Sequence, residues 1–138
     1  MPPVLLDTSV IVAFLDARER YHSRCTSVVS LLRPPLFTCE AVISESCHLL
    51  AAKHGASEDV LKNVINGTFQ IPFQLTACAP EILQILHKYR DTPADFADAC
   101  LIAMADQLDS GDILTLDSNF NHYRWRRNRS FRMLIPLD

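Results

Sequence analysis

Short apolar runs alternate with segments of helical periodicity along almost the whole chain. The runs have three to five residues each, which is typical of short buried strands, and they lie at residues 4–6, 36–39, 71–75, 113–116 and 131–135. Strands that alternate with helices predict a mostly parallel sheet, because a crossover between parallel strands is long enough to hold a helix. We therefore expect an α/β fold of three layers, a sandwich in which a sheet of about five strands is flanked by helices.

The segments between these runs carry signals that begin and end helices. Six helices are expected, one beginning at Pro80 and the others covering about residues 10–15, 20–32, 40–53, 57–66 and 94–108. Pro80 suits a helix start, where its missing N–H has no partner to lose. Gly55 is expected to end the third helix in a left-handed conformation, and Gly67 to end the fourth. Pro72 favours an edge position, or the strand start, for the run at 71–75.

Composition supports a single folded domain over residues 1–138. Hydrophobic residues make up 49% of the chain, with 3 Gly and 8 Pro, which argues against disorder. The net charge of -3 argues against nucleic-acid binding through overall positive charge, so any such contact needs local arginines or bound metal ions. We see no signal peptide, no Cys-x-x-Cys pair and no apolar run near the ~20 residues that span a bilayer. We expect a cytoplasmic protein with reduced thiols and no membrane contact.

Carboxylates follow two of the predicted strands directly. Asp7 ends the first apolar run and Asp117 ends the fourth. The carboxyl ends of parallel strands form the ligand-binding edge of an open sheet, and the N-termini of the following helices lie at the same edge. Glu45 and Asp98 lie near the starts of two such helices, so we expect both to reach this edge. Asp95 precedes Asp98 by three residues and shares its helical face.

Asp98 lies among the apolar and small residues of 96–105, a helix that must be largely buried. A buried carboxylate is costly unless it is paired, hydrogen-bonded or bound to a metal ion. Taken singly, each acid has a structural explanation, Asp7 and Asp95 as helix caps and Glu45 as helix surface. Together, four acids at one edge with no nearby set of Lys or Arg indicate a metal site. Oxygen ligands of this kind favour Mg²⁺ or Mn²⁺.

A carboxylate site of this kind can cleave phosphodiester bonds. Two ions roughly 3.5–4 Å apart can activate water and stabilise the leaving oxygen, so no other nucleophile is needed. A phosphatase with an aspartyl nucleophile is an alternative, but that chemistry usually needs a second acid two residues after the first, where this chain has Ser9. Cys47 and His48 do not suit a thiol nucleophile and its base, because neighbours in a helix point in different directions.

Four segments resemble the PIN domain family, in particular the VapC-type toxins of bacterial toxin–antitoxin pairs. They lie at residues 5–9, 44–45, 95–99 and 115–120 and read LLDTS, SE, DFADA and TLDSNF. The resemblance implies a PIN-like sandwich and a metal-dependent endoribonuclease that cleaves RNA with activated water, as the toxin of a type II pair. It also implies a homodimer and an antitoxin protein as partner. The alternative is a catalytically inactive PIN-type module that binds RNA or protein.

By this resemblance, the catalytic and metal-binding acids are Asp7, Glu45, Asp98 and Asp117. Asp95 matches a further acid that often precedes the third one, while Ser9 and Thr115 match hydroxyl positions near the metal. Both hydroxyl residues are equally well explained as cap and strand residues. Asn119 stands where the family often has a second acid, which leaves a second metal site open and keeps one-metal catalysis possible.

The segment at residues 123–129 is rich in arginine and holds two aromatic residues, Tyr123 and Trp125. Its arginines are Arg124, Arg126, Arg127 and Arg129. Arginine pairs with phosphate, and aromatic rings stack on unpaired bases, so the segment is a candidate RNA contact. The other interpretation is a solvated loop before an edge strand, with both aromatic side chains packed on the core.

Overall fold

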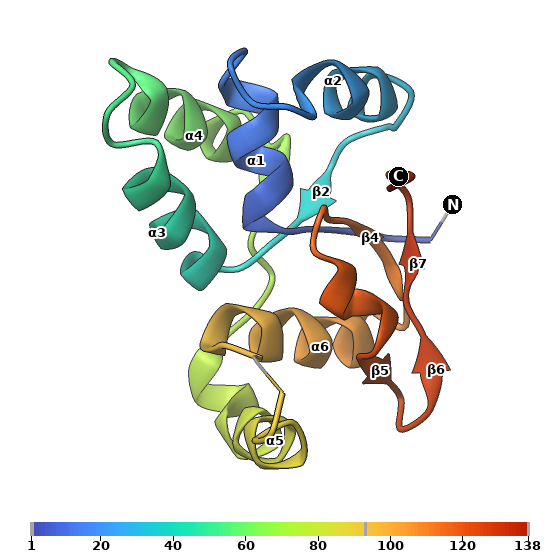
Figure 1. Cartoon of the computed structure of the whole chain (residues 1–138). Coiled ribbons are helices and arrows are strands. Elements are labelled where there is room, and N and C mark those ends of the chain that lie inside the picture. Colours follow the sequence, from blue (N-terminus) through green and yellow to red (C-terminus); the bar gives the residue numbers. More distant parts are fainter. Residues whose placement is uncertain (1, 93, 138) are drawn as a thin grey trace.

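A five-stranded parallel sheet lies at the centre of the computed structural model, which describes residues 2–92 and 94–137 (Figure 1). In chain order its strands are β1 (Val4–Leu6), β2 (Leu36–Phe37), β3 (Phe69–Gln70), β4 (Asp112–Leu114) and β7 (Arg132–Met133). Their order across the sheet is β3-β2-β1-β4-β7. Each neighbouring pair is parallel, and Leu5 of the central β1 lies opposite Phe37 on one side and Ile113 on the other. The predicted parallel sheet is confirmed.

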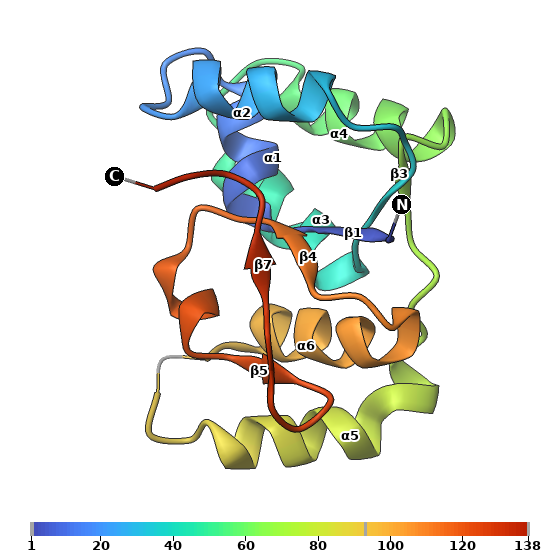
Figure 2. The same ribbon diagram turned by 90° about the vertical axis from the view of Figure 1, so that its right-hand side faces the viewer.

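Helices cover both faces of this sheet. The described part of the chain holds six α-helices: α1 (Thr8–Leu15), α2 (His22–Ser30), α3 (Glu40–Leu49), α4 (Ala56–Ile65), α5 (Leu75–Lys88) and α6 (Phe96–Leu108). Figures 1 and 2 show α1, α2 and α4 on one side of the sheet and α5 and α6 on the other, with α3 beside the strand ends. The three-layer arrangement is therefore confirmed.

The helix α6 is the most deeply buried helix of the fold. It lies between the sheet and α5, and every residue from Ala97 to Ala105 is buried. This explains its small and apolar sequence, because side chains on all sides of the helix meet other parts of the protein. Asp98 lies within this buried run. None of the helices in the described ranges combines the length and the apolar character that crossing a membrane requires.

The third strand lies earlier in the chain than its sequence predicts. β3 covers Phe69–Gln70, which pair with Leu36 and Phe37, and residues 71–75 lie outside the sheet. Pro72 has no N–H to donate to a strand ladder, so pairing does not extend through it. The edge position expected for this strand is confirmed.

Two helix boundaries also differ from the prediction. Pro80 lies inside α5, which begins five residues earlier at Leu75. The reason is packing: the buried face of α5 against α6 begins upstream of the proline, at the partly buried Cys78. Gly55 has the expected left-handed conformation (φ +76°), but it precedes α4 instead of ending α3, which already ends at Leu49.

An antiparallel hairpin, formed by β5 (Arg124–Trp125) and β6 (Arg129–Ser130), was not predicted. Its turn places Arg126 and Arg127 at positive φ, where non-glycine residues are uncommon. The sequence has none of the usual Asn-Gly or Asp-Gly turn signals. Contacts with the end of α6 hold the turn instead: the Arg126 N–H donates to Asp106 Oδ1, and the guanidinium lies 3.3 Å from Asp109 Oδ1.

Gly111 makes room for the indole ring of Trp125. A Cβ at position 111 would lie only 2.1 Å from Trp125 Nε1, far inside van der Waals contact. We expect Gly111→Ala to lower the free energy of unfolding by about 1–3 kcal/mol, because the ring must leave its place and its hydrogen bond to the Ser130 carbonyl. Urea unfolding measures this change. Trp125→Leu in the same chain should reduce the loss, and an unchanged urea midpoint for Gly111→Ala would contradict the close packing.

Candidate active site

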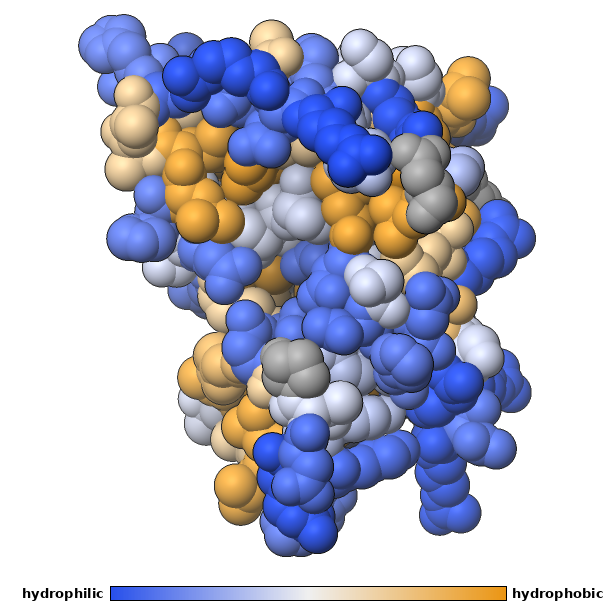
Figure 3. Space-filling model, in the orientation of Figure 1, coloured by the Kyte–Doolittle hydropathy of each residue, from blue (hydrophilic) through white to orange (hydrophobic). Residues whose placement is uncertain are grey.

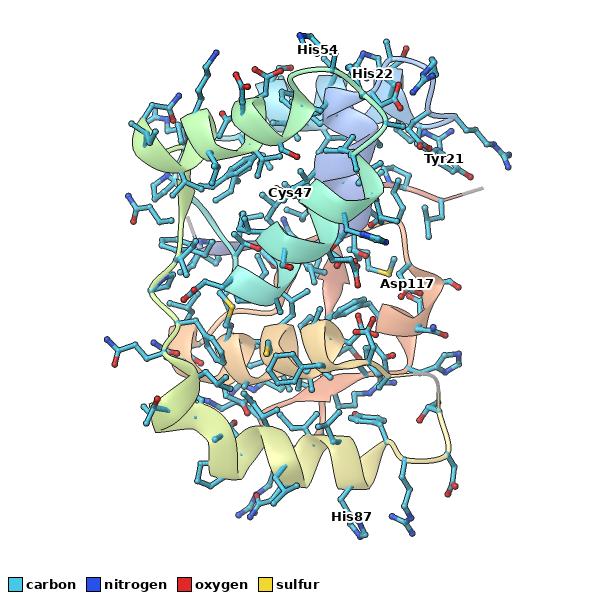
Figure 4. All side chains as sticks on the ribbon, turned by 90° about the vertical axis from the view of Figure 1, so that its left-hand side faces the viewer. Tyr21, His22, Cys47, His54, His87 and Asp117 are labelled. Carbon is cyan, nitrogen blue, oxygen red and sulfur yellow. The ribbon has the colours of Figure 1, made fainter. Side chains whose placement is uncertain are left out.

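The four predicted acids line one cavity at the carboxyl edge of the sheet. Asp7 follows β1, and Asp117 lies beyond the end of β4. Glu45 comes from α3, and Asp98 comes from the first turn of α6. All four border a cavity of about 410 Å³. In Figure 4 the labelled Asp117 lies between the upper helices and α6, so residues distant in sequence meet here.

Asp7 is buried and held by hydroxyl and backbone donors. Its Oδ1 accepts the Thr8 N–H at 2.8 Å, and its Oδ2 accepts the Thr115 hydroxyl at 2.6 Å and the Ser9 hydroxyl at 3.4 Å. Burial raises the pKa of Asp7 to about 6. The hydrogen bonds from Thr115 and Thr8 oppose this rise, and the nearby charge of Asp117 adds to it.

Asp98 belongs to a reciprocal cap at the start of α6. Asp95 Oδ1 accepts the Asp98 N–H at 2.9 Å, and Asp98 Oδ2 accepts the Asp95 N–H at 3.3 Å. The Tyr123 hydroxyl donates to the same Oδ2 at 3.2 Å. Burial raises the pKa of Asp98 to about 7, and the negative charges of Asp95, Asp7 and Asp117 raise it further. The cap role expected for Asp95 is confirmed, and Asp95 also lines the cavity.

The hydroxyl residues named by the resemblance connect the acids to the backbone. Thr115 Oγ1 donates to Asp7 and accepts the Asp117 N–H at 3.0 Å, so one buried side chain fixes two acid positions. Ser9 Oγ accepts the Leu116 N–H at 2.9 Å. Asn119 donates its backbone N–H to Asp117 Oδ1 at 2.9 Å and is not among the residues that line the cavity. Its role here is to orient Asp117 through the backbone.

Glu19 and Tyr123 also contribute polar groups to the site, and the sequence did not predict either of them. Glu19, in the turn between α1 and α2, lines the cavity as a further acid. Tyr123 bonds to Asp98 from behind the site. No local sequence pattern marks either residue. The direction in which the turn holds Glu19 and the partner of the Tyr123 hydroxyl both depend on how distant segments pack. Tyr123 lies in the arginine-rich segment, where the pattern of residues indicates a contact with RNA and not a bond to Asp98.

The donor set suits a hard divalent cation. The ionisable side chains that line the cavity are all carboxylates, and none of its described lining residues is Lys or Arg. Burial raises the pKa values of Asp7 and Asp98 most, and the negative charges of the other acids in the cavity add to the rise, so a bound cation would offset this repulsion. Within the described residues, no three acid, His or Cys side chains stand close enough to hold one ion together. Mg²⁺ usually keeps several water ligands and binds through one or two carboxylates, so it does not need three such side chains at one point.

The turn of the arginine-rich segment lies away from the cavity, although Tyr123 at its start bonds to Asp98. Arg126 contacts Asp106, which follows Asp98 by eight residues, or about 12 Å along a helix. Arg127 and Arg129 are exposed, and Lys88 donates to the Arg127 carbonyl. The two aromatic side chains, in contrast, are buried: Tyr123 is 0% exposed and Trp125 is 7% exposed. The interpretation that these rings pack on the core is confirmed, so they do not stack on bases.

The chain matches known proteins over most of its length. The family model described as PIN domain matches residues 4–126. The chain is 28% identical over 116 residues to Ribonuclease VapC26 of Mycobacterium tuberculosis, covering 83% of this chain and 86% of that protein. The crystal structure of Mycobacterium tuberculosis VapC20, described as a sarcin-ricin loop cleaving toxin, aligns with a TM-score of 0.78 and 16% identity, covering 86% of this chain and 93% of that one. That likeness shows the fold.

Proposed function

Because the chain belongs to the PIN domain family, we propose that it is a ribonuclease that depends on Mg²⁺ or Mn²⁺ and hydrolyses phosphodiester bonds within RNA. One observation carries the proposal: Asp7, Glu45, Asp98 and Asp117 come from four separate parts of the fold and line the same cavity. The likeness to a protein named as a ribonuclease supports the choice of RNA as substrate.

The proposed roles of the side chains follow from their contacts. When bound, Mg²⁺ or Mn²⁺ lowers the pKa of water and offsets negative charge on the phosphate. Asp7, Asp98 and Asp117 are the fixed acids, since hydrogen bonds hold all three of them. Glu45 offers its oxygens from α3. The acids also repel phosphate, so RNA is expected to enter only after their charge is offset.

The test uses purified protein and labelled total RNA. One set of reactions contains Mg²⁺ or Mn²⁺ and the other contains a chelator. Discrete products that form only with metal would support the ribonuclease. RNA that stays intact with folded, metal-loaded protein would reject a general ribonuclease. Direct Mn²⁺ titration then separates a highly selective enzyme from an inactive binding module, which has no reason to hold metal.

We propose further that the protein acts in the cytoplasm as the toxin of a type II toxin–antitoxin pair, as a homodimer. The likeness to VapC26 and VapC20 supports the toxin role. Exposed apolar side chains support a protein contact: Leu31, just after α2, and Ile65 of α4 are each 84% exposed. Induced expression in a bacterial host is the test, and growth that continues normally would reject the toxin. Light scattering measures the oligomeric state.

The arginines of the hairpin remain a proposed RNA contact, which comprises the half-buried Arg124 and the exposed Arg126, Arg127 and Arg129. Figure 3 shows hydrophilic surface over this corner, at the lower right. We expect Arg127→Ala to weaken RNA binding and to reduce the slope of log affinity against log salt by about 1, because one phosphate contact is lost. Binding is measured on the Asp98→Asn background, so that RNA is not cut.

Arg33→Ala is the matched control for this prediction. Arg33 is also an exposed arginine, but it lies in the loop between α2 and β2. An equal loss of RNA affinity in Arg127→Ala and Arg33→Ala would show a nonspecific effect of charge and would reject the hairpin as a contact surface. Arg126 is a poorer test residue, because it also pairs with Asp109 and holds the turn.

A further inference from the structure

Tyr123 is a buried residue at the junction of the acid site and the hairpin. Its side chain is 0% exposed, and it does not line the cavity. Its ring makes edge-to-face contacts with Tyr89 and Phe120, with centroid distances of 5.1 Å and 5.0 Å. Phe120 in turn packs against Phe131. This aromatic cluster fixes the ring, so the hydroxyl has one position.

The Tyr123 hydroxyl and the Asp95 backbone N–H donate hydrogen bonds to the same oxygen of Asp98. The hydroxyl donates to Oδ2 at 3.2 Å, and the Asp95 N–H donates to Oδ2 at 3.3 Å. Among the described residues, Oδ1 of Asp98 receives no such bond. Asp98 lines the cavity, and the two donors to Oδ2 hold the carboxyl group while they leave Oδ1 free to accept a further contact.

Asp7 has a comparable arrangement across the cavity. The buried Thr115 hydroxyl donates to Asp7 Oδ2 at 2.6 Å. Each of the two buried acids is therefore held by a side-chain hydroxyl that comes from a segment beyond β4. Partners of this kind orient a ligand group, and removing one typically costs about 10–100-fold in metal affinity or activity.

We propose that Tyr123 is a positioning residue for Asp98, holding Oδ2 so that Oδ1 is presented to a divalent cation. The inference rests on the proposed function, since it takes Asp98 as a metal ligand. It goes beyond the four acids by assigning part of the site's metal affinity to a buried residue that does not line the cavity. The hydrogen bond that Tyr123 provides comes from the residue just before β5, the first strand of the hairpin.

Tyr123→Phe is the direct test, because it keeps the ring and removes only the donor. We expect its Kd for Mn²⁺, measured by calorimetry, to rise by about 10-fold or more. RNA cleavage should fall most at limiting Mn²⁺ and recover in part when Mn²⁺ is saturating. Tyr89→Phe is the matched control: it removes a hydroxyl from the neighbouring ring, but that hydroxyl accepts the Arg124 N–H at 2.9 Å and bonds to none of the acids in the described ranges.

Two outcomes would overturn the positioning role. One is Mn²⁺ affinity at the wild-type level in Tyr123→Phe; the other is an equal loss in Tyr89→Phe, which would show a packing effect. A double-mutant cycle with Asp98→Ala distinguishes the contact from a general loss of stability. The Tyr123→Phe effect on Mn²⁺ affinity should vanish when the Asp98 carboxyl group is absent, and additive losses would reject the contact. If the wild type binds Mn²⁺ and never cleaves RNA, the ribonuclease fails while the positioning role stands.

Discussion

Replacing Asp98 with asparagine is expected to reduce RNA cleavage by at least about 100-fold, the scale of losing one charge-stabilising group in an active site. Asparagine keeps the shape of the side chain and an oxygen that can accept the Tyr123 and Asp95 hydrogens. It removes the negative charge that holds a divalent cation. Initial rates of RNA cleavage at saturating Mn²⁺, for variant and wild type, measure the effect.

The same variant is expected to be at least as stable as the wild type at pH 8 without metal. Burial and the charge of Asp95 raise the pKa of Asp98 to about 7, so the ionised group is unfavourable in the folded protein. Asp112→Asn is the control, since Asp112 is another buried acid but lies at the opposite end of β4. A variant that cleaves RNA at the wild-type rate would remove Asp98 from the mechanism.

The metal-free protein is expected to lose stability as the pH rises from about 4 to above 7. The pKa of Asp7 is raised to about 6 and that of Asp98 to about 7, from an ordinary value of 3.8. Between these values the folded protein holds protons that the unfolded chain has released, so the free energy of unfolding falls as the pH rises. For Asp7 alone the change is up to about 3 kcal/mol.

Urea unfolding in chelator at pH 5 and pH 8 measures this dependence. Asp16 does not disturb the comparison: hydrogen bonds from Arg18 lower its pKa to about 2, so its contribution is complete above pH 4. Asp7→Asn should reduce the dependence without abolishing it, because the pKa of Asp98 is raised to about 7 and the contact with Asp106 raises that of Glu81 to about 7 as well. Added Mn²⁺ should restore stability at pH 8 in the wild type. Stability that rises between pH 5 and pH 8 in chelator would show that the acids are not strained by burial.

Local sequence signals account well for the sheet and for the four acids. Asp7 and Asp117 are placed by the strands they follow, because parallel strands end at one edge. Asp98 is conspicuous because it interrupts an apolar helix. The boundaries of β3 and α5 were less predictable, since Pro72 and Pro80 allow more than one position and packing chooses between them.

The arginine-rich segment shows a limit of what sequence patterns can predict. Its composition suggests a single basic and aromatic surface, yet the structure separates the two classes: the arginines stay at the surface, while Tyr123 and Trp125 enter the core. The alternation of a short strand permits this division, but it does not say which face is inward. Contacts of the hairpin with α6 decide which of its side chains point into the core.

The sequence by itself therefore determined the α/β class, the strand ends and the acids that meet there, since these follow from short-range patterns and the rules of parallel sheets. Only the tertiary structure decided how the acids are held and what surrounds them. The Tyr123 bond to Asp98, the place of Glu19 and the packing of Trp125 on Gly111 each join segments separated by many residues. The physical reason is that burial and hydrogen-bond partners depend on how distant segments pack, which no local pattern of residues encodes.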